Sequence, residues 1–371
     1  MLVDTSIVER IYNALADEQS RKVFARRLQY SMIDSAENHR EIARLVIPEF
    51  IDKIESFTRC GDRVCVFGVG NECGYPGRLL LSLFDDQLPE IGVFDKRAAE
   101  LEEITYFSGF NRNTSTPGLM GVRNAKVHPP EKIRIIEKNI VMIVGTPNYL
   151  YQTEIITDLI SLGVPFERIA FIPAQMCYLC EDYFNHHFFE YNDKEVFIDC
   201  GCFDGQTSKH FFEAVQQRQG KVKKIIAFEP ELANYYLCRN NMESIPIFEV
   251  RNLGVWNEKT TLSFHSGQRG SSAVTQSGDT EINAVKLDEE LGEEKVTFIK
   301  MDVEGAELNA LKGAENVIRI NRPKLAISVY HRVDDIISIP EFIISLELDY
   351  RLFLRHQTGV YSDTILFGVP K

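Results

Sequence analysis

The sequence predicts an α/β protein with two units of parallel sheet, of which the second is the clearer. Short apolar runs of strand length alternate with helical patterns, and this happens twice along the 371 residues. In both series a glycine-containing loop follows the first strand. The length also suits two domains of roughly 150 residues each. Strands that alternate with helices imply a parallel sheet that is buried on both faces.

Composition and charge exclude several classes of protein. Hydrophobic residues make up 44% and charged residues 26% of the chain, which is ordinary for a folded protein. The formal net charge of −13 argues against binding to nucleic acid or to an anionic membrane surface. No apolar run reaches the roughly 18–20 residues of a membrane helix, and the N-terminus MLVDTSIVER has an acid where a signal peptide is basic. The eight scattered cysteines favour free thiols, so we expect a cytoplasmic protein.

Residues 1–58 are predicted to form an N-terminal helical segment. Ile7, Ile11 and Leu15 recur at helical spacing. A second amphipathic pattern runs over residues 42–54, where Pro48 is expected to break or kink the helix.

Residues 59–175 resemble a small Rossmann-like domain. The strand at 63–67 is followed by Gly68-Val69-Gly70 and, four residues on, by Gly74, while the strand at 91–94 ends on Asp95. That acid lies where a ribose-binding carboxylate is expected, but the glycine spacing is one residue too long for the dinucleotide fingerprint. Two interpretations stay open: a site for a nucleotide-linked sugar, or a ligand-free domain used for packing or for homodimer formation.

An NAD(P)-dependent sugar-nucleotide oxidoreductase or epimerase is a rival interpretation of the same loop. It would need a tyrosine–lysine or equivalent catalytic pair beside Gly68–Gly74, and none is evident in the sequence. Residues 176–194 are expected to connect the two domains. In this connector Cys177 and Cys180 have zinc-ligand spacing, with His186 and His187 nearby, although the aromatic composition favours a packed segment.

The second unit, residues 195–371, begins with a strand that ends in the acidic glycine loop Asp199-Cys200-Gly201-Cys202-Phe203-Asp204-Gly205. Glycine allows close approach of a ligand, and the acids would repel a pyrophosphate. The loop therefore fits a cationic ligand such as the amino group and sulfonium of S-adenosylmethionine. Thr207 is expected to cap or assist the following helix. Glu229, after the strand at 224–228, is placed to accept both hydroxyls of a ribose.

The remaining strands of this unit follow in two groups. The last of them lie close together without intervening helices, which predicts a hairpin at one edge of the sheet. The expected strands are 247–252, 260–265, 284–287, 296–301, 325–329, 350–354 and 364–369.

At this point the sequence resembles a known family. IDCGCFDGQT, AFEP, FIKMDVEGAELNALKGA, SVYH, LRH and the closing DTILFGVP are similar to the motifs of the FkbM family of S-adenosylmethionine-dependent methyltransferases. The resemblance covers residues 195–371, and KMDVEGAE with the downstream LKGA is its most specific part. It implies a class I methyltransferase fold with a mixed, mostly parallel seven-stranded sheet. It also implies O-methylation of a hydroxyl on a sugar, a glycan or a secondary metabolite.

The resemblance assigns cofactor roles by position. The glycine loop would line the methionine part, Glu229 would hold the ribose, and the end of the third strand would lie near the adenine. The residues expected to bind the cofactor are Asp199, Gly201, Cys202, Asp204, Gly205, Thr207, Glu229, Pro230, Asn252, Leu253 and Asp302.

A hydroxyl acceptor needs a base, and three residues are candidates: Asp302, Glu304 and His331. An Asp and a Glu two residues apart could instead hold a divalent cation, but we expect no metal. Glu307 is interpreted as a first-turn acid that the helix dipole favours.

Arg332 and His356 are expected to line the substrate site, whereas Arg355 either meets an anionic substrate or merely lies at the solvated edge of the sheet. The serine- and glycine-rich stretch 266–278 has the composition of a mobile lid. The last rival is a non-catalytic carbohydrate-binding protein. The set Asp204, Glu229 and Asp302 argues against it, because such a protein has no use for these acids.

Overall fold

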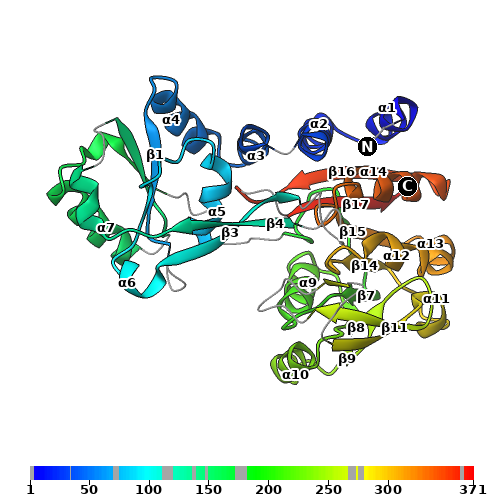
Figure 1. Ribbon diagram of the computed structural model, residues 1–371. Helices are drawn as coiled ribbons and strands as arrows, with labels where there is room; N and C mark the ends of the chain where they lie inside the picture. The colour runs from blue at the N-terminus through cyan, green and yellow to red at the C-terminus, as the bar shows by residue number, and fades with distance from the viewer. Residues whose placement is uncertain are drawn as a thin grey trace.

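The computed structural model contains two lobes, each built around a parallel or mostly parallel sheet (Figure 1). None of the described helices is both long and apolar enough to cross a membrane. The structure describes residues 4–33, 35–69, 75–110, 120–135, 139–146, 149–171, 182–265, 273–274, 280–359 and 363–371.

The predicted N-terminal helices are present, but the segment 1–58 does not pack as one unit. The helices are α1 (Thr5–Ala14), α2 (Glu18–Met32), α3 (Ala36–Ala43) and α4 (Pro48–Thr58). The apolar faces of α1 and α2 belong to the core of the second lobe, whereas α3 and α4 pack on the first. Pro48 begins α4 instead of kinking a longer helix, because the first helical position needs no backbone N–H.

The first lobe contains a four-stranded sheet in the order β2–β1–β5–β6, all parallel, which includes the strands predicted at 63–67 and 91–94. Alternate side chains of these strands face opposite layers of helix, as expected for a sheet covered on both sides. The elements are β1 (Arg63–Phe67), α5 (Tyr75–Phe84), β2 (Val93–Phe94), α6 (Ala98–Leu101), β5 (Ile140–Val144), α7 (Tyr149–Ser161) and β6 (Ile169–Phe171).

A hairpin that the sequence analysis did not predict extends from this lobe toward the second (Figure 1). Its strands are β3 (Glu103–Phe110) and β4 (Met120–Lys126).

The second lobe has the predicted seven-stranded sheet, in the order β16–β17–β15–β14–β7–β8–β9. Only β17 among these strands runs antiparallel to its neighbours, and its pairing with β16 is the predicted edge hairpin. The strands are β7 (Glu195–Cys200), β8 (Val222–Phe228), β9 (Phe248–Arg251), β14 (Phe298–Met301), β15 (Lys324–Ser328), β16 (Tyr350–His356) and β17 (Thr364–Pro370).

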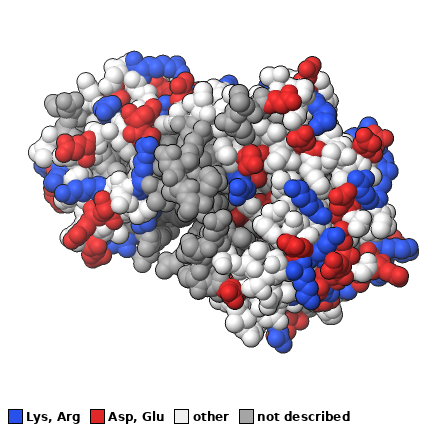
Figure 2. Space-filling model, turned by 45° about the vertical axis from the view of Figure 1, so that its right-hand side comes forward, with Lys and Arg blue, Asp and Glu red and all other residues white. Residues whose placement is uncertain are grey.

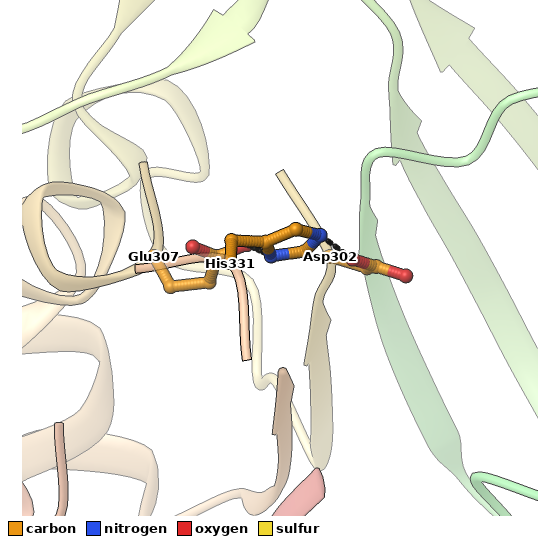
Figure 3. A group of neighbouring side chains, drawn as sticks. All are labelled: Asp302, Glu307 and His331. Carbon is orange, nitrogen blue, oxygen red and sulfur yellow. Dashed lines mark ion pairs between the residues drawn. The ribbon is translucent and has the colours of Figure 1, made fainter. Parts of the chain in front are cut away.

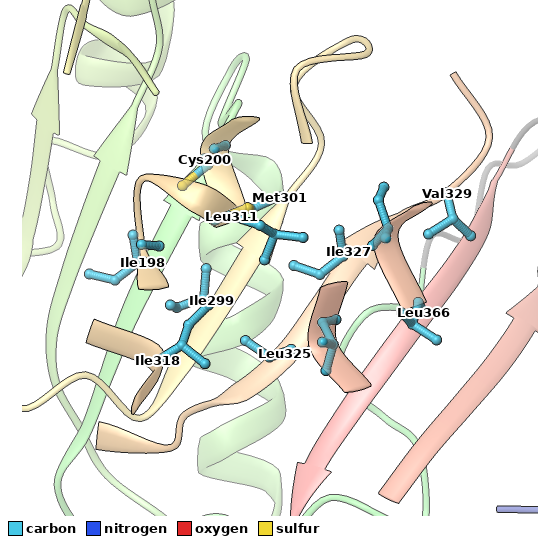
Figure 4. Packing of buried hydrophobic residues seen from close by; sticks show 14 of the residues in the cluster. Ile198, Cys200, Ile299, Met301, Leu311, Ile318, Leu325, Ile327, Val329 and Leu366 are labelled. Atoms are coloured by element: carbon cyan, nitrogen blue, oxygen red, sulfur yellow. The ribbon is translucent and has the colours of Figure 1, made fainter. Parts of the chain in front are cut away.

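Two layers of helix cover this sheet. On one face, Ile198, Met301 and Ile327 pack with α12, α13 and α14 in the apolar core drawn in Figure 4. The other face is covered by α9 and α10 and by a cluster of aromatic rings. The helices are α9 (Gln206–Gln217), α10 (Leu232–Asn241), α12 (Glu307–Lys312), α13 (Glu315–Asn321) and α14 (Asp335–Ser345).

Some of the predicted strands form a separate sheet, in the order β10–β13–β11–β12. The predicted strand 284–287 ends earlier, because a short helix, α11 (Leu287–Glu290), begins there. The strands are β10 (Gly254–Val255), β11 (Thr260–His265), β12 (Ala273–Val274) and β13 (Thr280–Val285). Apart from β12, the stretch interpreted as a lid lies outside the described residues.

The start of the chain closes the β16 edge of the large sheet. Leu15 forms a parallel β-bridge with Leu352, whose carbonyl accepts a 2.8 Å hydrogen bond from the backbone N–H of Ala16. Arg355 extends back from β16 to Asp17, with a nitrogen–oxygen distance of 2.7 Å. Arg355 is therefore buried in a link between α2 and the sheet, not placed to meet a substrate.

The part of the connector that is described is an aromatic core segment. Tyr183, Phe184 and Phe188 are buried against the sheet. His186 stacks on Phe188 with ring centroids 4.9 Å apart, so it is part of this packing. Cys177 and Cys180, the other members of the zinc interpretation, lie outside the described residues.

Candidate active site

The glycine loop lies at the carboxyl end of β7, where the strand order reverses between β8 and β14. Ligands of parallel sheets bind at such a switch point. Gly201 has a φ of +78°, and a Cβ there would overlap the carbonyl oxygen of Asp302. Because only glycine permits this approach, the loop lies directly against the residue that follows β14.

The loop leads into α9 through a second glycine with a left-handed backbone. Gly205 has a φ of +86° and is the N-cap of the helix. Thr207 lies inside the first turn, so the expectation that it caps α9 is wrong. Asp204 accepts a 3.0 Å hydrogen bond from the backbone N–H of Gln206 through Oδ1, and the Cys202 thiol lies 3.4 Å from that of Cys238.

Asp199 is held inside the protein by a cation that the sequence analysis did not single out. Its Oδ1 lies 3.2 Å from the Lys300 ammonium, and its Oδ2 accepts a 2.7 Å hydrogen bond from the Ser208 hydroxyl. Lys300 also donates to the carbonyl of Gly201 at 2.7 Å. Burial raises the pKa of Asp199, and Lys300 opposes this. A lysine inside a buried strand needs an anionic partner, and this was the signal in the sequence that could have identified the pair.

Glu229 follows β8 as predicted and faces the glycine loop. Its two oxygens accept backbone hydrogen bonds from Phe203 and Glu231, each at 3.0 Å. Burial raises the pKa of Glu229 to about 7, although these hydrogen bonds favour the charged form. The Asn252 side chain donates to the carbonyls of Glu229 and Pro230 at 2.9 and 3.0 Å. Asn252 therefore fixes the turn that carries the acid.

The three predicted base candidates come together at the carboxyl ends of β14 and β15. Nε2 of His331 lies 3.4 Å from Oδ1 of Asp302 and 3.5 Å from Oε2 of Glu304. On the other side of the ring, Nδ1 lies 2.9 Å from Oε1 of Glu307. Figure 3 shows the imidazole between Asp302 and Glu307. We call Asp302, Glu304, Glu307 and His331 the acid–histidine cluster.

The four side chains of this cluster differ in how far they are exposed to solvent. The Glu304 side chain is 31% exposed, against 15% for Asp302, 4% for His331 and none for Glu307. Glu304 also has a φ of +55°, which a residue with a side chain adopts only at a cost. The turn after β14 thus presents the Glu304 carboxyl to the solvent side and keeps the histidine behind it.

The electrostatics of the cluster favour a stored proton. Burial alone would lower the pKa of His331, but the carboxylates of Glu307 and Glu304 outweigh it and raise that pKa well above its ordinary value. Burial raises the pKa of Glu304 to about 8, and the nearby imidazolium opposes the rise. Two such close groups titrate as a pair.

Glu307 is more than a first-turn acid that the helix dipole favours. Besides contacting His331, its Oε1 accepts a 2.8 Å hydrogen bond from the backbone N–H of Val303. It therefore ties α12 to the turn after β14 and fixes the imidazole orientation. A second residue missed by the sequence analysis is Tyr183, whose hydroxyl donates to Oδ2 of Asp302 at 3.0 Å. No spacing signal could have found Tyr183, because it lies on the connector.

The two predicted substrate residues lie in different surroundings. Arg332 follows His331, is 43% exposed, and packs beside Gly305 next to the cluster. His356 is buried at the end of β16, where Nδ1 lies 2.9 Å from the Thr364 hydroxyl. Both lie at the carboxyl edge of the sheet, and Arg332 is the one beside the acid–histidine cluster.

A cation could use part of the same cluster. Asp302, Glu307 and His331 can each offer one ligand atom within 4.8 Å of the others. Nδ1 of His331 already lies 2.9 Å from Oε1 of Glu307 as an ion-pair contact. A protonated His331 would balance part of the acidic charge in the place of such a cation.

Comparison with known proteins finds one family that matches part of the chain. Residues 199–352 match a family described as the methyltransferase FkbM domain. Among solved structures, a methyltransferase FkbM from Methylobacillus flagellatus KT is 17% identical, with 85% of this chain and 93% of that chain covered and a TM-score of 0.51. At that identity the likeness shows the fold. No curated protein matches the sequence.

Two further solved structures resemble only about half of the chain. An rRNA methylase from Streptococcus thermophilus is 15% identical over 53% of this chain and 96% of that chain, with a TM-score of 0.33. Fibrillarin from Aeropyrum pernix, with natively bound S-adenosyl-L-methionine, is 9% identical over 48% of this chain and 67% of that chain, also with a TM-score of 0.33.

Proposed function

Residues 199–352 form a methyltransferase FkbM domain, and from this premise we propose that the protein O-methylates a sugar or glycan hydroxyl with S-adenosylmethionine. The observation that carries the proposal is the contact of Gly201 with Asp302. Because of this contact, the glycine loop that would hold the cofactor lies directly beside the acid–histidine cluster. A methyl donor held by the loop and a base in the cluster would then face the same acceptor.

The residues around the loop fit this cofactor. Gly201 lets the loop lie against the backbone of Asp302, and Asp204 and Asp302 supply negative charge near the loop. Such charge suits a cationic methionine moiety and would repel a pyrophosphate. Glu229, once ionised, can accept the two ribose hydroxyls. When bound, S-adenosylmethionine would supply an electrophilic methyl group with a positive charge on its sulfur.

The protein's own part in the reaction is to orient the acceptor and remove its proton. We assign removal of the acceptor's hydroxyl proton to the pair of His331 and Glu304. Glu304 is the more exposed member and so reaches the acceptor hydroxyl, while His331 lies 3.5 Å behind it and shares the proton. A group with a pKa near the working pH is the most effective general base, and the pKa of about 8 for Glu304 meets this condition. Glu307 acts by positioning the ring.

A sugar hydroxyl is the acceptor that this chemistry favours. The proton of a sugar hydroxyl is hard to remove, and this would explain why the acid–histidine cluster lies beside the glycine loop. Acidic and basic side chains are interspersed on the described surface of the face drawn in Figure 2, whereas a polynucleotide needs a basic band. The free thiols of Cys60, Cys65, Cys200, Cys202 and Cys238 suit a reducing cytoplasm, where we propose that the enzyme acts.

Isothermal titration with S-adenosylhomocysteine is the first test. We expect micromolar binding by the wild type, loss of binding in Glu229→Ala, and retention in Glu304→Gln. The Glu304→Gln variant should lose methyl transfer to a panel of sugars by roughly a hundredfold or more. Absence of S-adenosylhomocysteine binding by the wild type would refute the methyltransferase proposal, and transfer to RNA but not to sugars would refute the acceptor class. If EDTA abolishes the activity and Mg²⁺ restores it, the acid–histidine cluster holds a metal ion instead of a proton.

A further inference from the structure

The carboxyl edge of the first sheet repeats the geometry of the cofactor site in the second. In each lobe a glycine with positive φ comes directly after the first strand: Gly68 at +95° after β1, and Gly201 at +78° after β7. In each lobe this glycine lies against the backbone that follows the neighbouring strand. A Cβ on Gly145, after β5, would overlap the carbonyl oxygen of Gly68.

The acid after the second strand makes the same two hydrogen bonds in both lobes. Asp95 accepts a 3.0 Å hydrogen bond from the backbone N–H of Val69, in the loop after β1. It accepts a second, of 2.9 Å, from the backbone N–H of Arg97, two residues on. Glu229 likewise accepts one hydrogen bond from the backbone N–H of Phe203, in the loop after β7, and one from the backbone N–H of Glu231, two residues on. Both are 3.0 Å long. Asp95 and Glu229 are 7% and 6% exposed.

The strand order of the first lobe completes the likeness. The chain passes from β1 to β2 on one side and then to β5 on the other. The switch point therefore lies between β1 and β5, beside Gly68 and Gly145, and this is where open parallel sheets bind nucleotides.

The two edges differ in the charged side chains that accompany the buried acid. The second lobe presents Asp204, Asp302 and Glu304. At the first, Arg78 donates a 3.0 Å hydrogen bond to the carbonyl of Val69, and Arg97 lies 3.8 Å from Asp95. Two guanidinium groups beside a glycine loop attract phosphate, for which arginine is well suited.

From these relationships we propose that the first lobe binds a nucleoside diphosphate. Asp95 would accept the ribose hydroxyls and Arg78 would face the phosphates, at the carboxyl edge of β1, β2 and β5. The ligand is either the free diphosphate or the same group within a nucleotide-linked sugar. The site goes beyond the proposed methyl transfer, because nothing in that reaction requires a second nucleotide.

Calorimetric titration of the full chain with UDP, ADP and UDP-glucose tests the proposal. We expect at least one of them to bind in the micromolar range, and to bind at least about tenfold more weakly to Asp95→Asn and to Arg78→Gln. Arg63→Gln is the matched control, since Arg63 is an exposed cation at the opposite end of β1. It should bind like the wild type. Tighter binding of UDP-glucose than of UDP would identify a nucleotide sugar as the ligand, and equal binding the free diphosphate.

Two further measurements keep this site distinct from the cofactor site. The nucleotide should give the same heat with protein saturated in S-adenosylhomocysteine, and Glu229→Gln should leave nucleotide binding unchanged. Absence of binding by the wild type at millimolar nucleotide, or competition with S-adenosylhomocysteine, would overturn the proposal. If the nucleotide binds while S-adenosylhomocysteine does not, the methyl-transfer proposal fails and this one stands.

Discussion

Nδ1 of His331 and Oε1 of Glu307 are 2.9 Å apart, with the carboxylate completely buried behind the ring. This contact fixes which nitrogen of the imidazole faces the acceptor side, since Nε2 is then directed at Asp302 and Glu304. A buried carboxylate that orients a histidine also raises its basicity.

The Glu307→Gln variant should therefore lower kcat and change its pH dependence. The base acts only when deprotonated, so the wild-type rate should rise with pH through about 8, the pKa of Glu304. The Glu307 charge raises the pKa of Glu304 as well as that of His331, so its removal should move the midpoint to lower pH. We expect kcat to fall roughly tenfold to hundredfold, measured as initial rates from pH 6 to 10.

Glu315→Gln is the control for that experiment. Glu315 also lies in the first turn of a helix, α13, but it is 40% exposed and pairs with Arg319. It should leave both the rate and the midpoint unchanged. Equal effects of the two substitutions would mean that Glu307 acts only through the helix dipole.

Cofactor binding should release a proton near pH 6.5. The pKa of Glu229 is raised to about 7 by burial, so the free protein carries a proton there that ribose binding must remove. Affinity for S-adenosylhomocysteine should therefore increase from pH 6 to 8. Titration in buffers of different ionisation enthalpy should give more than about half a proton released per ligand at pH 6.5. Glu229→Gln should abolish the release, and an unchanged release would assign the proton to another group.

Gly201→Ala should be far more damaging than Gly292→Ala. Both glycines have positive φ, but Gly292 has nothing within 4 Å of the added Cβ, whereas at Gly201 it overlaps Asp302. We expect about 1 kcal/mol of destabilisation at Gly292 from backbone strain alone, and more than about 4 kcal/mol at Gly201. Urea denaturation measures the free energy of unfolding of both variants. Similar losses would show that the loop can move away from Asp302.

Asp17→Ala should loosen the N-terminal helices from the sheet. Asp17 is the N-cap of α2 and the ion-pair partner of Arg355. Although burial opposes it, the hydrogen bonds of Arg355 and Ser20 lower the pKa of Asp17 to about 2. The stabilisation is therefore present above the ordinary pKa and is lost as the pH falls toward 2. We expect a loss of about 1–2 kcal/mol at pH 7, and little change in the neighbouring, 69% exposed Glu18→Ala.

The sequence predicted the strands of the large sheet well because buried strands leave local signals. A buried parallel strand is visible as an apolar run, and the glycines and acids that follow such strands pointed to Gly201, Glu229 and Asp302 as candidates. Their common location at the carboxyl edge of the sheet followed from strand parallelism.

The partners supplied by distant segments could not be predicted in this way. Tyr183 reaches Asp302 across 119 positions of sequence, and no periodicity encodes such a contact. The separation of α1–α2 from α3–α4 was missed for a related reason. Amphipathic patterns show that a helix buries one face, but they do not show against which sheet.

The contacts of α1 and α2 with β16 have a consequence for the order of folding. Ser20 accepts a hydrogen bond from the backbone of Leu354, 334 residues later. Synthesis proceeds from the N-terminus, so α1 and α2 are made before β16 and β17. Their apolar faces stay uncovered until these strands exist. Contacts of such long sequence separation form slowly. Helices α1 and α2 are therefore synthesised long before they can reach their final positions.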